Sequence, residues 1–343
     1  MAPRCEDKNK APAGILFRVR TLQENHAMRR VALIHNPASG QHSTKHSAAI
    51  DKALAVLREA GIEAEAIETL SAGSAGAQAE EAVRRGCDTV LACGGDGTVH
   101  EVLQRLVGST AVLGVVPLGT ANALAANLGL GRSPAKAVRK LLTALPVRVP
   151  VGLISYRDAA GSMRSRYFTV AAGVGADALL LSRLDPGLKR RFGYILYVIE
   201  AFRLWAAYSF PLFEASFVES GSAQPRVESL TQLLAVRIRN FGGVLQNFVP
   251  GATLHKDGLR LVAIRTRSRL RYLHMMMAVL IGRQRFSREI EVLDAVSVEC
   301  RACNGFAGRV FAEADGEVLG DLPVRIEIAP QTVTLLIPPG ARP

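Results

Sequence analysis

Three glycines surround one acid in the stretch Gly94-Gly95-Asp96-Gly97-Thr98. The apolar run before it, residues 88–93, predicts a buried strand, and apolar positions at helical spacing predict a helix over 98–107. Glycine lets the backbone approach a ligand closely, and the N–H groups at a helix start attract anions. A carboxylate beside a phosphate needs a cation or a hydroxyl proton between them, so Asp96 indicates Mg²⁺ handling or activation of an acceptor hydroxyl. The alternative is a simple tight turn, because Gly and Asp are common in turns.

Two further loops of this kind follow apolar runs in the first half of the chain. Residues 31–35 lead into Asn36-Pro37-Ala38-Ser39-Gly40, and residues 112–117 lead into Leu118-Gly119-Thr120-Ala121-Asn122. Strands alternate with helices up to about residue 145, which predicts a parallel sheet with helices on both faces. Ligands of such sheets lie beyond the carboxyl ends of the strands, so we expect the three loops at one edge. Their recurrence favours a phosphate site over a simple turn.

After about residue 146 the pattern changes to strands separated by Gly, Pro and Asn, which predicts a mainly antiparallel second domain. The expected strands are 147–156, 166–172, 212–219, 229–239, 258–265, 291–300, 309–314, 322–328 and 332–337. Two helical segments, 192–208 and 270–281, interrupt them. The first is rich in aromatic residues and follows Lys189, Arg190 and Arg191, which indicates contact with a lipid surface. The second either packs on the sheets or touches a membrane.

The charge balance favours anionic partners. In 343 residues there are 42 Lys and Arg against 30 Asp and Glu, a net charge of +12. Because no dense basic block with interleaved aromatics is present, we expect nucleotide or an acidic membrane surface rather than nucleic acid. Five unevenly spread cysteines indicate a reducing compartment. With no long apolar run, we expect a cytoplasmic protein that associates peripherally with the inner face of the membrane.

Five short motifs, taken in order, resemble the diacylglycerol kinase catalytic family, which includes sphingosine and ceramide kinases. They are residues 36–40, residues 94–102 with His100 where Asn is usual, residues 117–122, Asp257-Gly258-Leu259 and Asp315-Gly316-Glu317. The resemblance implies an NAD kinase- and phosphofructokinase-like α/β domain at 29–145, which binds ATP. It also implies a lipid-binding β-sandwich domain at 146–343. Residues 1–28 are expected to be a disordered extension.

The resemblance further implies an ATP- and Mg²⁺-dependent lipid kinase of phospholipid metabolism. It would transfer the γ-phosphoryl group to the hydroxyl of diacylglycerol or of a related lipid or sphingoid alcohol. Glu317 would accept the hydroxyl proton, with Asp96 as the competing base, and a metal would bind Asp257 and the Leu259 carbonyl. The residues expected to contact ATP are Asn36, Pro37, Ala38, Ser39, Gly40, Thr69, Gly94, Gly95, Asp96, Gly97, Thr98, Val99, His100, Gly119, Thr120 and Asn122.

The chain departs from the family pattern at two places. Ala123 stands where many members carry Asp, and Leu254, His255 and Lys256 precede Asp257 where a further acid is usual. Both departures remove potential support for a metal ion. Two alternative functions stay open: an NAD kinase-like enzyme with a soluble acceptor, and a nucleotide-binding regulator without catalysis. A homodimer is also left open. The chain carries no P-loop, dinucleotide-binding or protein-kinase signature.

Overall fold

A computed structural model describes residues 28–37, 43–158, 160–176, 178, 205, 209–219, 224–241, 249–280, 289–303 and 309–343. The helices are α1 (Ser43–Glu59), α2 (Ser74–Arg84), α3 (Asp96–Leu106), α4 (Ala123–Asn127), α5 (Pro134–Leu141) and α9 (Arg269–Leu280). The strands are β1 (Arg30–His35), β2 (Glu63–Glu68), β3 (Thr89–Gly94), β4 (Val112–Pro117), β5 (Leu145–Arg157), β6 (Met163–Phe168), β7 (Ala171–Gly175), β8 (Phe213–Glu219), β9 (Arg226–Leu230), β10 (Gln232–Val236), β11 (Leu259–Ile264), β12 (Ile290–Ala302), β13 (Phe311–Ala314) and β14 (Glu317–Ile337). The expected N-terminal extension apart from Met28, the basic cluster 189–191 and, apart from Trp205, the helical segment 192–208 lie outside the described residues.

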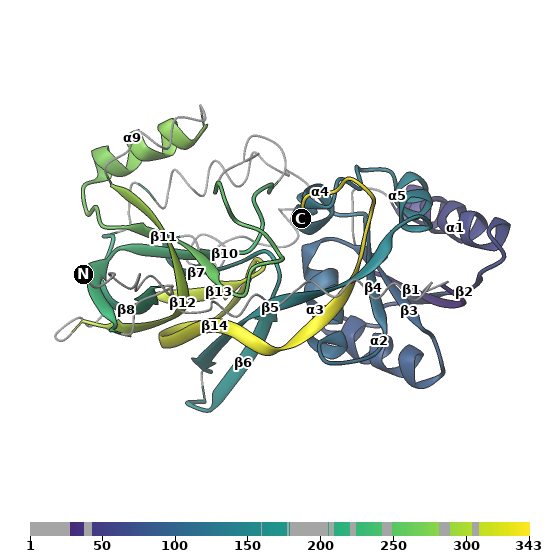
Figure 1. The fold of residues 1–343 in the computed structure, drawn as a ribbon, viewed down its shortest axis with the longest axis horizontal. Helices are drawn as coiled ribbons and strands as arrows, with labels where there is room; N and C mark the ends of the chain where they lie inside the picture. The colour runs from purple at the N-terminus through teal and green to yellow at the C-terminus, as the bar shows by residue number, and fades with distance from the viewer. Residues whose placement is uncertain are drawn as a thin grey trace, which may run out of the picture.

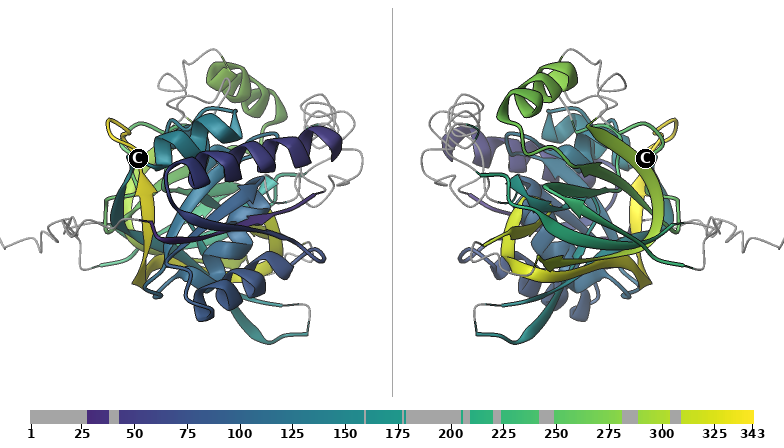
Figure 2. Two further views of the ribbon diagram at one scale, coloured as in Figure 1. Left: turned by 90° about the vertical axis from the view of Figure 1, so that its right-hand side faces the viewer. Right: turned by 90° about the vertical axis from the view of Figure 1, so that its left-hand side faces the viewer.

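The first half of the chain forms the expected parallel sheet, with strand order β2-β1-β3-β4. Every residue of β3 and β4 is buried, because helices cover both faces of the sheet. Helices α1 and α5 lie on one side, and α2 and α3 lie on the other (Figures 1 and 2). The α/β prediction for this half is confirmed.

The second half is the antiparallel sandwich that the pattern predicts, with strand order β13-β7-β10-β11-β12-β8-β9. Two expected strands are each divided. Residues 166–172 separate into β6 and β7, and residues 229–239 separate into β9 and β10. At the second break, the Thr231 hydroxyl lies 3.1 Å from the Ile264 carbonyl oxygen and 3.0 Å from that of Thr266. This side chain fixes the turn between the two strands.

Strand β14 joins the two halves of the molecule. The expected strands 322–328 and 332–337 are one strand, whose pairing with β5 shifts register between Ile328 and Thr332. The end of β14 then pairs in parallel with β4, at Thr334 and Val112, and so completes the sheet of the first half. Figure 1 shows β5 and β14 running between the halves. The predicted boundary at 145/146 thus marks where β5 begins, while the end of the chain returns to the first half.

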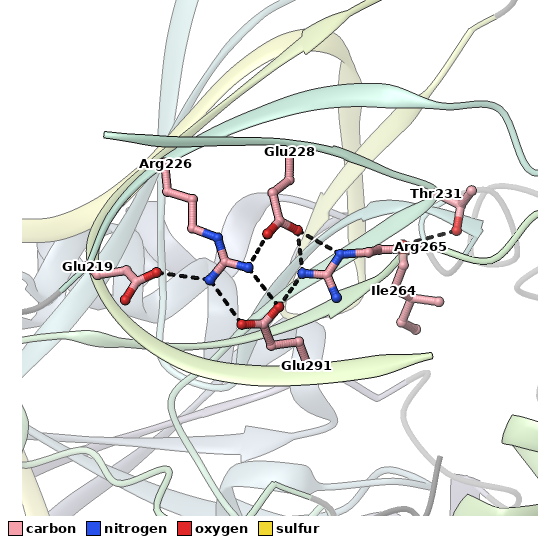
Figure 3. Close-up of polar contacts among 7 residues, drawn as sticks. All are labelled: Glu219, Arg226, Glu228, Thr231, Ile264, Arg265 and Glu291. Atoms are coloured by element: carbon pink, nitrogen blue, oxygen red, sulfur yellow. Dashed lines mark hydrogen bonds and ion pairs between the residues drawn. The ribbon is translucent and has the colours of Figure 1, made fainter. Parts of the chain in front are cut away.

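A charged network on the sandwich connects four strand regions (Figure 3). Arg226 Nη1 lies 3.0 Å from Glu219 Oε1 and 3.0 Å from Glu291 Oε1. Arg265 Nε donates to Glu228 Oε2 at 2.7 Å, and its Nη2 also bonds Glu291. The hydrogen bond from Arg226 lowers the pKa of the Glu291 carboxyl. These contacts hold the edge strand β9 to its neighbours and occupy two of the arginines in the basic excess.

Helix α9 packs one face on the sandwich and exposes another. Tyr272 and Met275 are buried beside Phe210, and the Tyr272 hydroxyl bonds the Gln232 side chain. On the exposed face, Leu270 is 75% and Met277 is 50% accessible to solvent. Figure 1 shows α9 above β11, at the end of the molecule away from β1–β4. None of the described helices has the length and apolar character needed to cross a membrane.

Candidate active site

The Gly-rich stretch forms the turn between β3 and α3. The helix begins at Asp96, two residues earlier than expected, with Gly95 as its N-cap and no side chain capping it. A methyl group on Gly94 would lie 2.4 Å from Thr98 Oγ1, so this position accepts only glycine without a rearrangement. The first turn of α3 therefore offers backbone N–H groups and the positive end of a helix dipole to an anion.

The Asp96 carboxylate holds the neighbouring loop. Its Oδ2 accepts the Asn122 backbone N–H at 2.9 Å, and its Oδ1 accepts that of Ala123 at 2.7 Å. These two residues open the short helix α4, and Asn122 has a left-handed backbone with φ 52°. Both Asp96 oxygens thus support the backbone that follows β4, which gives this acid a positioning role as well as any role in catalysis.

The loop after β4 is closed by its own asparagine. The Asn122 side chain accepts the Gly119 N–H at 2.9 Å and donates to the Gly119 carbonyl at 2.7 Å. A methyl group on Gly119 would lie 2.4 Å from the Cα of Gly95, so the two loops meet backbone to backbone. Asn122 therefore shapes the loop. Thr120, which lies between Gly119 and Asn122 in the sequence, is exposed. The expected ATP contacts Gly95, Gly119 and Thr120 are in this way brought together.

The first expected loop begins at the same edge of the sheet. The Asn36 N–H lies 3.4 Å from the Cys93 carbonyl oxygen, and the Thr69 N–H donates to the His35 carbonyl at 2.9 Å. Asn36 and Thr69 thus follow the ends of β1 and β2, next to the end of β3. Pro37 is exposed, and Ala38, Ser39 and Gly40 lie outside the described residues.

Glu317 reaches this site from the second half of the chain. A methyl group on Gly97 would lie 3.3 Å from Glu317 Oε1, so the carboxylate stands directly beside the first turn of α3. Within the described ranges, Glu317 is exposed and its carboxylate takes part in no hydrogen bond or ion pair. The structure therefore brings together the two acids that the sequence could not rank. Asp96 accepts hydrogen bonds from the backbone through both of its carboxylate oxygens, whereas the carboxylate of Glu317 is free to accept a proton.

A buried carboxylate fixes the turn that carries Glu317. Asp315 accepts the backbone N–H groups of Thr169, Val170 and Ala171 at 3.0, 2.8 and 3.1 Å. This contact explains why the expected strand 166–172 is broken, because those three N–H groups turn towards a side chain. Asp315 itself has φ 49°, a left-handed conformation that Asp and Asn tolerate better than most residues.

His100 places α3 against that same turn. Its Nδ1 lies 3.5 Å from Asp315 Oδ2, long for a hydrogen bond but within ion-pair range, and both side chains are buried. Burial by itself lowers the pKa of His100. The attraction of the Asp315 carboxylate, together with the charge of Glu317, outweighs burial and holds the pKa of His100 above its ordinary value. His100, an expected ATP contact, thus sits beneath the site and connects its two halves.

Gln104 is a second link that the sequence reading missed. Its side chain donates to the Tyr167 carbonyl at 2.9 Å and accepts the Tyr167 N–H at 2.9 Å, extending the edge of β6. It lies one helical turn after His100, so both side chains project from α3 towards the second half. That shared helical face is the signal that could have indicated the contact.

The expected metal residues lie on a loop that already contains a cation. Asp257 is exposed and Leu259 begins β11. The buried guanidinium of Arg237 lies within the loop and donates to four backbone carbonyls, those of Pro150, Leu254, Lys256 and Gly258. Across the part of the chain that the structure describes, no three His, Cys, Asp or Glu residues cluster as a metal site. This loop therefore fits a divalent cation poorly.

The comparisons with known proteins agree with the fold. Residues 30–154 match the diacylglycerol kinase catalytic domain, and residues 169–337 match the YegS C-terminal NAD kinase beta sandwich-like domain. The two matches together cover both halves of the molecule. The chain belongs to the diacylglycerol kinase catalytic family, and it is a kinase.

Curated relatives and solved structures extend over nearly the whole chain. A diacylglycerol kinase of Bacillus subtilis (strain 168) is 25% identical over 299 residues, covering 86% of this chain and 92% of its own. One from Mycobacterium tuberculosis (strain CDC 1551 / Oshkosh) is 29% identical over 324 residues, covering 91% and 96%. A crystal structure of a diacylglycerol kinase from Bacillus anthracis str. Sterne shares the fold, with a TM-score of 0.62 at 17% identity and coverage of 92% and 98%.

Proposed function

We propose that this kinase transfers the γ-phosphoryl group of ATP to the hydroxyl group of a lipid, with diacylglycerol or a related lipid alcohol as the acceptor. The observation that carries the proposal is the position of Glu317, unpaired and beside the first turn of α3. A carboxylate next to a phosphate-binding turn is useful when an acceptor hydroxyl lies between the two. The related diacylglycerol kinases support a lipid as that acceptor.

In the proposed reaction, the acceptor hydroxyl gives its proton to Glu317 as its oxygen bonds the γ-phosphorus. The bond between the γ-phosphorus and the β,γ-bridging oxygen breaks, and ADP leaves with the electron pair. The N–H groups at the start of α3 stabilise the negative charge on the phosphates, which is the main contribution of a protein to phosphoryl transfer. Mg²⁺ bound to ATP would neutralise negative charge on the phosphates.

Asp96 acts in this account by placing the phosphate-binding backbone. Its bonds to Asn122 and Ala123 fix the loop after β4 against the turn before α3. The site then presents the exposed Thr120 and the N–H groups of α3 in one arrangement. Positioning of this kind is worth a large rate factor, because small displacements of reacting groups are costly.

We further propose that the protein works at the surface of an anionic membrane, with α9 as a contact. Leu270 and Met277 expose apolar side chains on this helix. Arg267 and Arg269, which begin this region, are also exposed. An apolar face flanked by basic residues suits the boundary between lipid headgroups and acyl chains.

The substrate is tested by incubating the purified protein with γ-labelled ATP and a panel of acceptors. The panel contains diacylglycerol, monoacylglycerol, ceramide, sphingosine and, as a soluble acceptor, NAD. We expect label in one or more lipids and none in NAD. Transfer to NAD alone would overturn the lipid assignment, and no transfer to any acceptor would favour a regulator without catalysis.

The membrane contact is tested by sedimentation with vesicles of neutral lipid and with vesicles that contain anionic lipid. The double variant Leu270→Ser with Met277→Ser should bind anionic vesicles more weakly than the wild type. The matched control is Leu145→Ser, which also removes an exposed apolar side chain, but from the start of β5. Equal binding by all three proteins would exclude α9 as the contact.

A further inference from the structure

Arg237 is a buried arginine at the end of β10. The residue is 1% exposed, and its guanidinium donates to Lys256 O and Gly258 O at 2.7 Å each. It also donates to Leu254 O at 3.0 Å and to Pro150 O at 2.9 Å. Three of these carbonyls belong to the loop before β11, and the fourth belongs to β5. Four backbone oxygens therefore surround the positive charge of this side chain.

In other proteins, a bound metal ion can hold backbone carbonyl oxygens around one positive charge in the same way. Backbone carbonyls gathered with a carboxylate are a common ligand set for Mg²⁺ and Ca²⁺. Here the carbonyls of residues 254, 256 and 258 already accept hydrogen bonds from the guanidinium. The charge of Asp257 raises the pKa of Arg237 against the stronger lowering by burial. That pKa lies at about 10, so the guanidinium stays charged at neutral pH.

The electrostatics of the loop disfavour a second cation. The guanidinium of Arg237 is buried, so a divalent ion near Asp257 would meet its positive charge at short range, where the low dielectric around a buried charge makes the repulsion strong. Lys256 adds another positive charge on the adjacent residue, although its ammonium lies 3.8 Å from Asp294.

We propose that the guanidinium of Arg237 is the resident cation of residues 254–259, and that this loop takes no divalent metal ion. The sequence expectation of a metal at Asp257 and Leu259 is replaced by an internal arginine that performs the same structural task. It follows that the divalent ion needed for phosphoryl transfer is the one that enters with ATP. This inference concerns a different part of the molecule from Glu317, and it holds whichever acceptor the enzyme uses.

The direct test is binding of Mn²⁺ to the full chain without nucleotide, measured by electron paramagnetic resonance. Up to about 1 mM Mn²⁺, the weak end of protein cation sites, we expect the wild type and Asp257→Asn to bind equally. We also expect the melting temperature of the wild type to be the same in Mg²⁺ and in EDTA. A stoichiometric Mn²⁺ site that Asp257→Asn removes would overturn the proposal.

The structural role of the guanidinium is tested by Arg237→Met, which keeps an apolar stem and removes the charge. Four backbone carbonyls, one of them in a fully buried contact, lose their donor, so we expect the melting temperature to fall by about 5 °C or more. The matched control is Arg239→Met. Arg239 lies two residues further along the chain and donates one hydrogen bond, of 3.3 Å, to the Arg342 carbonyl. Equal melting temperatures for the two variants would contradict the proposal, and the Mn²⁺ measurement on the wild type decides it even if Arg237→Met does not fold.

Discussion

The turn that carries Asp96 and the turn that carries Glu317 each bring one carboxylate to the same site, but they hold it in opposite ways. Asp96 accepts a backbone N–H through each of its oxygens. The Glu317 carboxylate is exposed and accepts no hydrogen bond from the described residues, while a different acid, Asp315, anchors its turn. The difference separates two tasks. The bonded acid places backbone, and the free acid can exchange a proton.

The largest expected effect among the supporting residues comes from Asp96→Asn. An amide offers one acceptor oxygen, and its NH₂ group would face a backbone N–H, so one of two bonds is lost and replaced by repulsion. We expect turnover to fall by about 10²-fold or more, because the loop after β4 shifts relative to the phosphates. The melting temperature and the affinity for ATP should fall as well. Scanning calorimetry measures the melting temperature, and nucleotide titration measures the affinity for ATP. If Asp96→Asn had normal affinity and stability, the proposed difference in role between Asp96 and Glu317 would be wrong.

Next in size is the loss of Asp315. In Asp315→Ala, three buried N–H groups lose their acceptor, which costs about 3 kcal/mol of unfolding free energy in total if each group is partly hydrated. Asp315→Asn keeps the left-handed backbone and one acceptor oxygen, so it should cost less. Urea unfolding measures both variants. Equal stability of Asp315→Ala and the wild type would show that the turn is fixed by something else.

A smaller effect is expected from Gln104→Ala. Two hydrogen bonds to the backbone of Tyr167 disappear, and water can replace part of them at the edge of β6, so we expect a cost of about 1 kcal/mol. Because Gln104 connects α3 to the second half, the distance between Gly97 and Glu317 should become less well defined. Turnover should then fall more than nucleotide affinity. A change in affinity alone would assign Gln104 to the nucleotide site instead.

The smallest effect is a pH dependence that involves His100. Since the folded pKa of His100 is raised, its contribution to stability is fully present below about pH 6.5, the ordinary value, and is lost as pH rises through the folded pKa. The melting temperature of the wild type should therefore drop relative to that of His100→Asn as pH rises above about 6.5. Thermal unfolding over a pH series measures this difference, and parallel curves would rule out a charged His100 in the folded protein.

The sequence predicts the first half of the molecule better than the second. Residues 90–93 and 112–117 are continuous apolar runs, and a strand buried on both faces needs no other signal. The break at Thr169 and Val170 has no local signal, because the acceptor of their N–H groups is Asp315, which is 146 and 145 residues away along the chain. Local patterns do not contain such partners.

The candidate site shows the same limit. The Gly-rich motifs locate the loops, since glycine positions such as Gly94 and Gly119 are required by contacts within a few residues or between adjacent strands. The ranking of Asp96 and Glu317 depends on which N–H groups surround them, and the sequence does not carry that information. The burial of Arg237 does have a signal in the sequence. Leu233, Ala235 and Arg237 are two residues apart along the expected strand 229–239, so they lie on the same face of it, and that face is buried.

The most direct test of the account is the turnover of Glu317→Gln, measured beside its affinity for ATP. The substitution keeps the size of the side chain and removes its ability to accept a proton, so loss of a general base should lower turnover by about 10²–10⁴-fold. Titration calorimetry should give nearly unchanged ATP affinity, and the melting temperature should stay close to that of the wild type, because the carboxylate accepts no hydrogen bond from another described group and acts on His100 only through its charge. Turnover within a few-fold of the wild type would contradict the assignment of Glu317 as the proton acceptor.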